Sequence, residues 1–408
     1  MSARIITRTI APVSLLALAS LALAPASATG SGTWAQKGST LAGSAANDLF
    51  GVALSIDADG DTIAIGASDN DDTFSNAGQV RVLGFADGAW SALGSAIDGA
   101  ASEDYFGSAL SLSDDGTRVA VGAPFYGAGD TGRVRVFEYS GGSWTLMGAA
   151  IDGEDAGERA GGSVAISGDG STVVIGAAFN DYAGTDRGEV RVYRWNSGTT
   201  TWDRRGSLDI AGERDQDRLG YSVAINTNGT IIAAGARDND GAAGSSSNAG
   251  HARAYYFNTG TNQWAQRGGD IDAEAAGDRL GTAVSLDSAG DVLAIGAPNN
   301  DIGATATDAG HTVVYAWDAD STDWVQRGTD IDGAAGDDSG TSVSVSADGN
   351  SLLVGSPGNN SDAGSANLYA WDGAAWTVSA PTRVGSAGDA AGTAVSLSGD
   401  GNTVSVGL

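Results

Sequence analysis

The stretch FGSALSLSDDGTRVAVGAP, residues 106–124, decides the fold. After Gly107 it runs through small and apolar residues, reaches Asp115 and Gly116, and continues in a more hydrophobic run. Asp-Gly is typical of tight hairpin turns because glycine accepts a positive φ and aspartate tolerates one. The stretch therefore predicts two short antiparallel strands, an inner one of small residues and a second one buried on both faces.

The same unit recurs along the chain. A marker glycine opens the inner strand at Gly51, Gly107, Gly161, Gly220, Gly281, Gly340 and Gly392. A marker tryptophan opens an outer strand at Trp34, Trp90, Trp144, Trp202, Trp264, Trp324 and Trp376. Both series step by 52 to 62 residues, a length typical of a propeller blade. Each unit also holds a third strand, such as GEVRVYRW from Gly188, so we expect four strands per blade.

The two ends of the repeat region predict how the ring closes. The strand at Trp34 precedes the first inner strand, so we expect it to complete the last blade and remove an open edge. That blade supplies strands from Thr393 and Asn402, but no third strand follows before Leu408. The predicted fold is an all-β, seven-bladed β-propeller with four-stranded antiparallel blades, its last blade incomplete and closed by the N-terminal strand. The missing strand leads us to expect a truncated reading frame.

The N-terminus has the composition of an export signal. Arg4 and Arg8 precede an apolar run over residues 11–24, and small residues follow up to Ala28. This pattern predicts a signal peptide over residues 1–28, cleaved after Ala28, and a propeller over residues 29–408. We therefore expect an extracellular or periplasmic protein whose mature chain does not insert into a membrane.

The net charge of −29 and the absence of cysteine restrict the possible partners and chemistry. An acidic surface repels nucleic acid and anionic membranes, so we expect neither as a partner. Without cysteine there is no disulfide framework and no thiolate chemistry. We expect a monomer held together by packing alone.

The motifs resemble a known family, the FG-GAP repeat in its bacterial form. The resemblance covers residues 34–408 and rests on Phe50-Gly51, Phe106-Gly107, Gly122-Ala123-Pro124 and Gly296-Ala297-Pro298. It implies a propeller like that of integrin α-subunits, which bind protein ligands on one face and calcium in loops on the other. The nearest match to those calcium loops, DADGD over residues 57–61, is too short to surround an ion. We expect no cofactor and at most weak Ca²⁺ binding by the acidic loops.

Loops from strand 2 to strand 3 and from strand 4 to the next blade should share one face, because strands alternate in direction. These loops vary in length and chemistry, as binding loops on a rigid scaffold do. Acids and non-repeated aromatics make up the candidate ligand residues: Asp69, Asp71, Asp72, Tyr105, Phe125, Tyr126, Asp181, Tyr182, Tyr221, Asp238, Asp240 and Asp301.

A second set of acids lies three residues before each marker glycine. Its members are Asp48, Asp104, Glu158, Asp217, Asp278, Asp337 and Asp389. A short acid in such a turn accepts hydrogen bonds from backbone N–H groups, so we assign these residues a structural role.

Catalysis has little support in the sequence. The two histidines, His251 and His311, occupy one repeat position, which favours packing over a catalytic or metal-binding role. No catalytic constellation separates from the repeat, so we name no catalytic residue and no metal site, and we expect a non-enzyme. Two function classes remain: a binding or adhesion module for extracellular protein or glycan, and alternatively a carbohydrate-active hydrolase or lyase using one of many carboxylate pairs.

Overall fold

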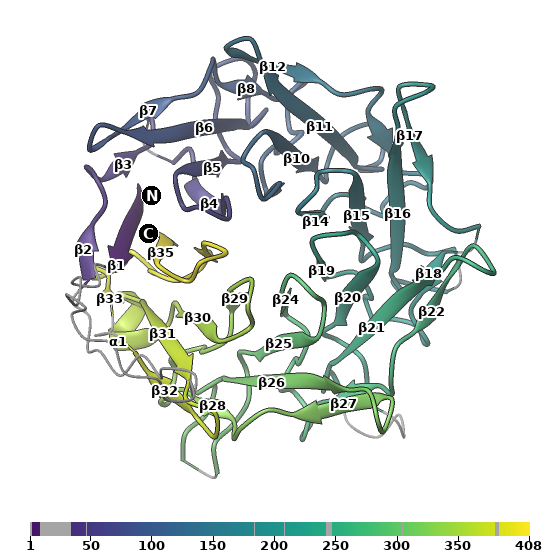
Figure 1. The fold of residues 1–408 in the computed structure, drawn as a ribbon, viewed down its shortest axis with the longest axis vertical. Helices are drawn as coiled ribbons and strands as arrows, with labels where there is room; N and C mark the ends of the chain where they lie inside the picture. The colour runs from purple at the N-terminus through teal and green to yellow at the C-terminus, as the bar shows by residue number, and fades with distance from the viewer. Residues whose placement is uncertain are drawn as a thin grey trace, which may run out of the picture.

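The computed structural model describes residues 2–8, 34–45, 47–182, 184–207, 209–241, 247–303, 305–379 and 383–408. Within them, seven five-stranded antiparallel sheets stand around a central axis (Figure 1). Six of these blades are each built from consecutive strands, and the remaining blade combines the two ends of the chain. The single helical element of the described residues is the short turn α1 (Asn359–Asp362).

The strands fall into five positions from the axis outward. The first position holds β4 (Phe50–Ile56), β9 (Ala109–Leu112), β14 (Ser163–Ile166), β19 (Ser222–Ile225), β24 (Ala283–Leu286), β29 (Ser342–Val345) and β34 (Val395–Leu397). The second holds β5 (Thr62–Ala67), β10 (Arg118–Ala123), β15 (Thr172–Ala177), β20 (Ile231–Ala236), β25 (Val292–Ala297), β30 (Ser351–Ser356) and β35 (Thr403–Gly407). The third holds β6 (Gln79–Ala86), β11 (Arg133–Ser140), β16 (Glu189–Asn196), β21 (His251–Asn258), β26 (His311–Asp318), β31 (Ser365–Trp371) and β1 (Ser2–Arg8).

The last two positions share the outer edge. The fourth holds β7 (Ala89–Ala92), β12 (Ser143–Leu146), β17 (Thr201–Arg204), β22 (Gln263–Gln266), β27 (Asp323–Gln326), β32 (Trp376–Val378) and β2 (Trp34–Gln36). The fifth holds β8 (Ile97–Asp98), β13 (Ile151–Asp152), β18 (Ile210–Ala211), β23 (Ile271–Asp272), β28 (Ile331–Asp332), β33 (Arg383–Val384) and β3 (Leu41–Ala42).

The predicted fold class is wrong as stated, first in the number of strands per blade. The outer strand is broken, so that the fourth and fifth strands pair with different halves of the third. In one blade β12 pairs with Phe137 to Ser140 of β11, while β13 pairs with its first two residues. The break coincides with Gly148, which has a φ of 74° that other residues adopt reluctantly. Each blade therefore has five strands rather than four.

The predicted fold class is also wrong about the last blade, because this blade has all five strands. Strand β1 occupies the third position, with Ala3 opposite Gly407 and Thr7 opposite Thr403 of β35. Strand β2 pairs with the other edge of β1, so both chain ends meet in this sheet (Figure 1). Residues 2–8 thus supply the third strand whose absence led us to expect a truncated reading frame. Residues 9–33, which hold most of the predicted signal peptide, lie outside the described residues.

The inner hairpin turns form a closed ring of backbone hydrogen bonds around the axis. The amide of Ala58 donates to the Asp114 carbonyl at 3.0 Å, and Asp114 donates to Gly168 of the next blade at 2.9 Å. The series closes where Asp400 donates to the Ala58 carbonyl at 3.3 Å. Because every turn is bonded to its neighbour, the axis has no open edge between blades.

The marker tryptophans join neighbouring blades at the rim. Each indole N–H donates to a carbonyl at the outer edge of the preceding blade, as Trp264 does to Arg205 at 2.8 Å. The other described cases are Trp90, Trp144, Trp202, Trp324 and Trp376. The repeated tryptophan is thus used to pack blades together.

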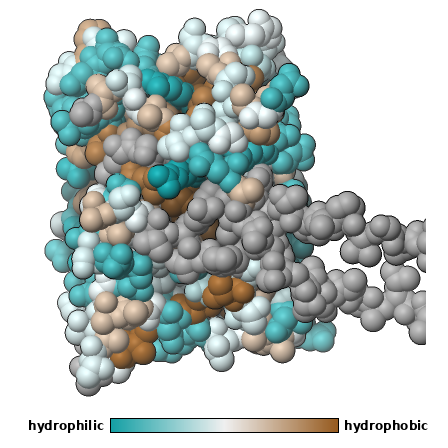
Figure 2. All heavy atoms as spheres, turned by 90° about the vertical axis from the view of Figure 1, so that its left-hand side faces the viewer, coloured by the Kyte–Doolittle hydropathy of each residue, from teal (hydrophilic) through white to brown (hydrophobic). Residues whose placement is uncertain are grey.

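Figure 2 shows the rim beside β3 and α1, where hydrophilic residues surround smaller hydrophobic groups.

Candidate ligand-binding site

The two loop sets predicted to share a face do meet in space. The parallel bridge between Gly132 and Ala160 joins the end of a strand 2-to-3 loop to the loop that enters the next blade. Four further blade junctions repeat this bridge, at Gly78–Phe106, Gly188–Leu219, Gly250–Leu280 and Gly364–Ala391. Side chains from neighbouring blades therefore lie close together on this face.

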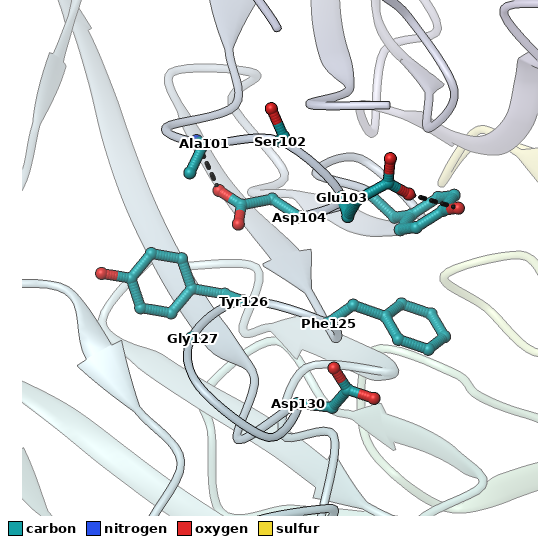
Figure 3. Close-up of a pocket in the computed structure, with 9 residues that line it drawn as sticks. Ala101, Ser102, Glu103, Asp104, Phe125, Tyr126, Gly127 and Asp130 are labelled. Carbon is teal, nitrogen blue, oxygen red and sulfur yellow. Dashed lines mark hydrogen bonds between the residues drawn. The ribbon is translucent and has the colours of Figure 1, made fainter. Parts of the chain in front are cut away.

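A large hollow of this face lies between the loop from β8 to β9 and the loop from β10 to β11. It has a volume of about 840 Å³ and is lined by residues 101–105, by Phe125, Tyr126 and Gly127, and by Asp130. Figure 3 shows the Phe125 and Tyr126 rings pointing to opposite sides of their loop. Three predicted ligand residues, Tyr105, Phe125 and Tyr126, thus line one site.

Tyr105 is held in place at the edge of this hollow. Its hydroxyl donates to Glu103 Oε2 at 3.0 Å, and its ring lies 5.1 Å from that of Phe125. Hydrogen bonds from Asn76 and Tyr105 hold the pKa of Glu103 below its usual value. The same bond to Glu103 raises the pKa of Tyr105.

Arginines continue the aromatic contacts into the next two blades. The Arg159 guanidinium lies 4.6 Å from the centroid of Phe125 and 4.9 Å from that of Phe179. Arg218 also lies 4.9 Å from the centroid of Phe179. We call Tyr105, Phe125, Arg159, Phe179 and Arg218 the aromatic–arginine strip. Guanidinium and ring attract each other electrostatically, which holds these side chains in a fixed order.

A second hollow of about 240 Å³ lies along this strip. Phe125, Arg159, Phe179 and Tyr221 contribute to its walls. Tyr221 is itself covered by the Arg237 guanidinium at 3.9 Å. The Arg159 side chain keeps 37% of its surface exposed, so its charge can reach a ligand.

The strip breaks the repeat symmetry, and three of its members were not among the residues predicted from the sequence. The position of Tyr105, two residues before the marker glycine, is occupied elsewhere by Leu49, Arg159, Arg218, Arg279, Asp338 and Ala390. The position of Phe125 is occupied elsewhere by Asp69, Phe179, Asp238, Asn299 and Gly358. Comparing these two positions blade by blade would have found Arg159, Phe179 and Arg218.

Two further predicted ligand aromatics contribute less to the two hollows, because Tyr126 lines the first hollow but is partly covered and Tyr182 lies outside both. The Tyr126 ring is covered by the Arg133 guanidinium at 3.6 Å, which leaves only part of it for a ligand. Tyr182 is 82% exposed and is not part of either hollow.

The predicted ligand acids are mostly engaged within their own loops. Four carboxylates each accept a hydrogen bond from a backbone N–H that lies five to eight residues later in the chain: Asp71, Asp181, Asp240 and Asp301. Asp69 accepts the Ser68 hydroxyl, and Asp72 accepts Gln79 Nε2. Asp238 is 7% exposed and lies 2.8 Å from Arg218 Nη1. These bonds leave the acids fewer free oxygens for a cation.

The acids before each marker glycine all accept backbone hydrogen bonds in their turn. Asp104 Oδ2 accepts the N–H of Ala101 at 2.8 Å, and burial raises the pKa of this carboxyl. The corresponding acceptors are Asp48, Glu158, Asp217, Asp278, Asp337 and Asp389. The short turn over residues 57–61 is similar, because Asp57 Oδ1 accepts the amides of Asp61 and Thr62.

One of these acids belongs to a buried ion-pair network. Glu158 is fully buried and receives both Arg191 Nη1 and Nη2 at 2.7 Å. Arg191 Nε also donates to Glu189 at 2.8 Å. Burial by itself would raise the pKa of Glu158, but its hydrogen bonds and charge interaction with Arg191 hold it below the usual value.

Comparison with known proteins supports the fold. No family model matches the chain, and no curated protein matches it in sequence. A hydrazine synthase structure from Kuenenia stuttgartiensis aligns with a TM-score of 0.55 at 13% identity, covering 86% of this chain and 90% of that one. A periplasmic gluconolactonase from Pseudomonas aeruginosa aligns with a TM-score of 0.55 at 15% identity, covering 95% and 99%.

Both structures share too little sequence identity with this chain for a function to be transferred, so they are evidence for the fold alone. Among the described residues, no helix is long and apolar enough to cross a membrane. The chain is an all-β propeller of repeated blades, similar in fold to the hydrazine synthase and gluconolactonase structures.

Proposed function

We propose that this protein is an exported binding module that recognises an acidic glycan through the aromatic–arginine strip. The observation that carries the proposal is the alternation of aromatic rings and guanidinium groups across three blades. A sugar ring offers apolar faces for Phe125 and Phe179, and a carboxylate or sulfate offers paired oxygens for Arg159. Arginine suits such anions because its planar fork can donate two parallel hydrogen bonds.

The charge of the whole chain supports a specific role for these arginines. A protein of net charge −29 repels anions in general, so an anionic ligand needs a local cationic site. Arg218 is already paired with Asp238 at 2.8 Å, whereas Arg159 lies 3.9 Å from Asp130 Oδ2 and is 37% exposed. Arg159 therefore supplies the cation, at a position whose backbone is fixed by the bridges between blades. We extend the proposal to adhesion through this face, to a monomer, and to membership of the FG-GAP family, for which the Phe-Gly and Gly-Ala-Pro clusters are the support.

Binding to a panel of immobilised neutral, uronate-bearing and sulfated glycans tests the proposal. We expect acidic glycans to bind, and Phe179→Ala or Arg159→Gln to weaken binding by about tenfold or more, as loss of one stacked or charged anchor does. Tyr182→Ala is the matched control, because this aromatic is exposed and lies outside both hollows. Affinities equal in all variants, or binding confined to neutral glycans, would contradict the assignment. Turnover of a bound glycan would indicate the hydrolase or lyase class instead.

Export is a separate part of the proposal with its own test. We expect the N-terminal sequence of the protein recovered from the periplasm or medium to begin at Thr29, since cleavage after Ala28 fits the small-residue rule. Such cleavage also removes β1 and exposes the edge of β35 that β1 covers. We therefore expect the 29–408 chain to unfold at a lower temperature than the 1–408 chain. Recovery of an exported chain that still begins at Ser2 would show that the strand is retained.

A further inference from the structure

Three potential metal ligands meet beside one blade, outside the aromatic–arginine strip. Glu274 lies in the loop from β23 to β24, His311 is the first residue of β26, and Asp330 directly precedes β28. One ligand atom from each lies within 4.8 Å of the other two. His311 is 2% exposed, whereas Glu274 is exposed, so the cluster is anchored in the blade and open to solvent on one side.

The same positions hold related groups in the two preceding blades, which makes a direct comparison possible. In blade β14–β18 the equivalents are Glu154, Glu189 and Asp209. In blade β19–β23 they are Glu213, His251 and Asp270, whose ligand atoms also lie within 4.8 Å of one another. All three blades therefore gather at least two carboxylates at this place.

The number of arginines that pair with these carboxylates falls from blade β14–β18 to blade β19–β23. In blade β14–β18, Arg191 contacts Glu189, and Arg204 contacts Glu154 at 2.9 Å and also Asp209. In blade β19–β23 one arginine remains: Arg253 forms a two-bond pair with Asp270 at 2.7 and 2.8 Å and an ion pair with Glu213. These carboxylates are neutralised by the protein itself.

Among the residues that the structure describes, no such cation lies at the third cluster. The equivalent of Arg253 is Val313, and the equivalent of Arg204 is Gln326, whose amide donates to Asp330 Oδ1 at 2.6 Å. Within the described ranges, no arginine or lysine pairs with Glu274 or Asp330, and no hydrogen bond reaches a ring nitrogen of His311. At the equivalent His251, Nε2 is buried without a hydrogen-bond partner. Two carboxylates this close favour a cation between them.

We infer that Glu274, His311 and Asp330 bind a divalent transition metal, for which Zn²⁺ is the best match. Imidazole nitrogen with two carboxylates suits Zn²⁺, whereas Ca²⁺ and Mg²⁺ prefer oxygen ligands alone. Three protein ligands leave one position of a tetrahedral ion for water or for a ligand group on this face. The Glu213 cluster is not such a site, because Arg253 already occupies both of its carboxylates.

Titration of the full chain with ZnCl₂ by calorimetry tests the inference. We expect one site per chain, not displaced by millimolar Ca²⁺, and a loss of affinity of roughly 100-fold or more in His311→Ala. Val313→Arg should abolish binding by placing the arginine of the preceding blade between the carboxylates. Arginine occupies this position in four other blades, as Arg81, Arg135, Arg191 and Arg253, so we expect the fold to accept it.

His251→Ala is the matched control and should leave the stoichiometry at one. Glu274→Gln removes an exposed carboxylate and keeps the test valid should Val313→Arg fail to fold, as judged by circular dichroism. Loading with Co²⁺ gives an independent readout, because imidazole coordination produces visible absorption bands that His311→Ala should eliminate. An unchanged Zn²⁺ affinity in His311→Ala and Glu274→Gln, or no saturable binding by the full chain, overturns the inference.

Discussion

Replacing Arg191 by Met is expected to lower the free energy of unfolding by about 3–5 kcal/mol at neutral pH, the usual cost of removing one partner from a buried ion pair. Glu158 is fully buried and Glu189 is 2% exposed, and both depend on this guanidinium. Methionine fills a similar volume, so the loss reports the unpaired carboxylates rather than a cavity. Urea unfolding followed by tryptophan fluorescence measures it.

The pH dependence of this variant separates charge from packing. In the native protein the pKa of Glu158 is below its usual value, so the ion pair stabilises the fold at neutral pH and loses its effect as the pH falls through the folded pKa. Without Arg191, burial raises the pKa of Glu158 above that of the unfolded chain. Protonation then favours the folded variant, and the stability gap to the native protein should narrow from neutral pH to about pH 4.5.

Arg194→Met on the same strand is the matched control for Arg191→Met. Arg194 is exposed, so its loss should change the free energy of unfolding by less than about 0.5 kcal/mol. Two results would show that Arg191 does not keep Glu158 ionised. One is a small change in the free energy of unfolding of Arg191→Met at neutral pH, and the other is a stability difference from the native protein that grows as the pH falls.

Gly296→Ala is expected to destabilise the fold by about 3 kcal/mol, at the upper end of overpacking costs. A Cβ at this position of β25 would lie 1.9 Å from the carbonyl oxygen of Gly340, which opens the next blade. The expected cost comes from this steric clash and not from backbone strain, because Gly296 does not have the left-handed φ that many glycines of this chain have. The backbone cannot easily shift, since the Gly340 amide is bonded to the Gly355 carbonyl at 3.0 Å.

Thermal and urea unfolding measure this effect, with Gly269→Ala as the control. Gly269 also lacks a left-handed φ, and the nearest atom to its added Cβ would be Asp323 Oδ1 at 3.7 Å. We therefore expect Gly269→Ala to be nearly neutral. Equal stabilities of the two variants would mean that the blades can move apart at the axis without cost.

The sequence by itself determined the repeat, its inner hairpins and the packing role of its tryptophans. These features depend on short-range signals: the Asp-Gly turn at Gly116 needs only its own residues, and the small residues after Gly107 reflect crowding near an axis. The placement of Tyr105 and Phe125 on one face also followed, because both lie in loops that the alternating strand directions bring to that face.

Only the tertiary structure decided how the last blade is completed and where charged side chains from different blades meet. The pairing of residues 2–8 with β35 joins segments about 400 residues apart, and no local pattern marks Ser2–Arg8 as the partner of that edge. The contact of Arg159 with Phe125 and Phe179, and the meeting of Glu274, His311 and Asp330, depend on loops and strands that are not adjacent in the sequence. A repeat predicts what each blade contains, whereas packing between blades decides which charges are neighbours.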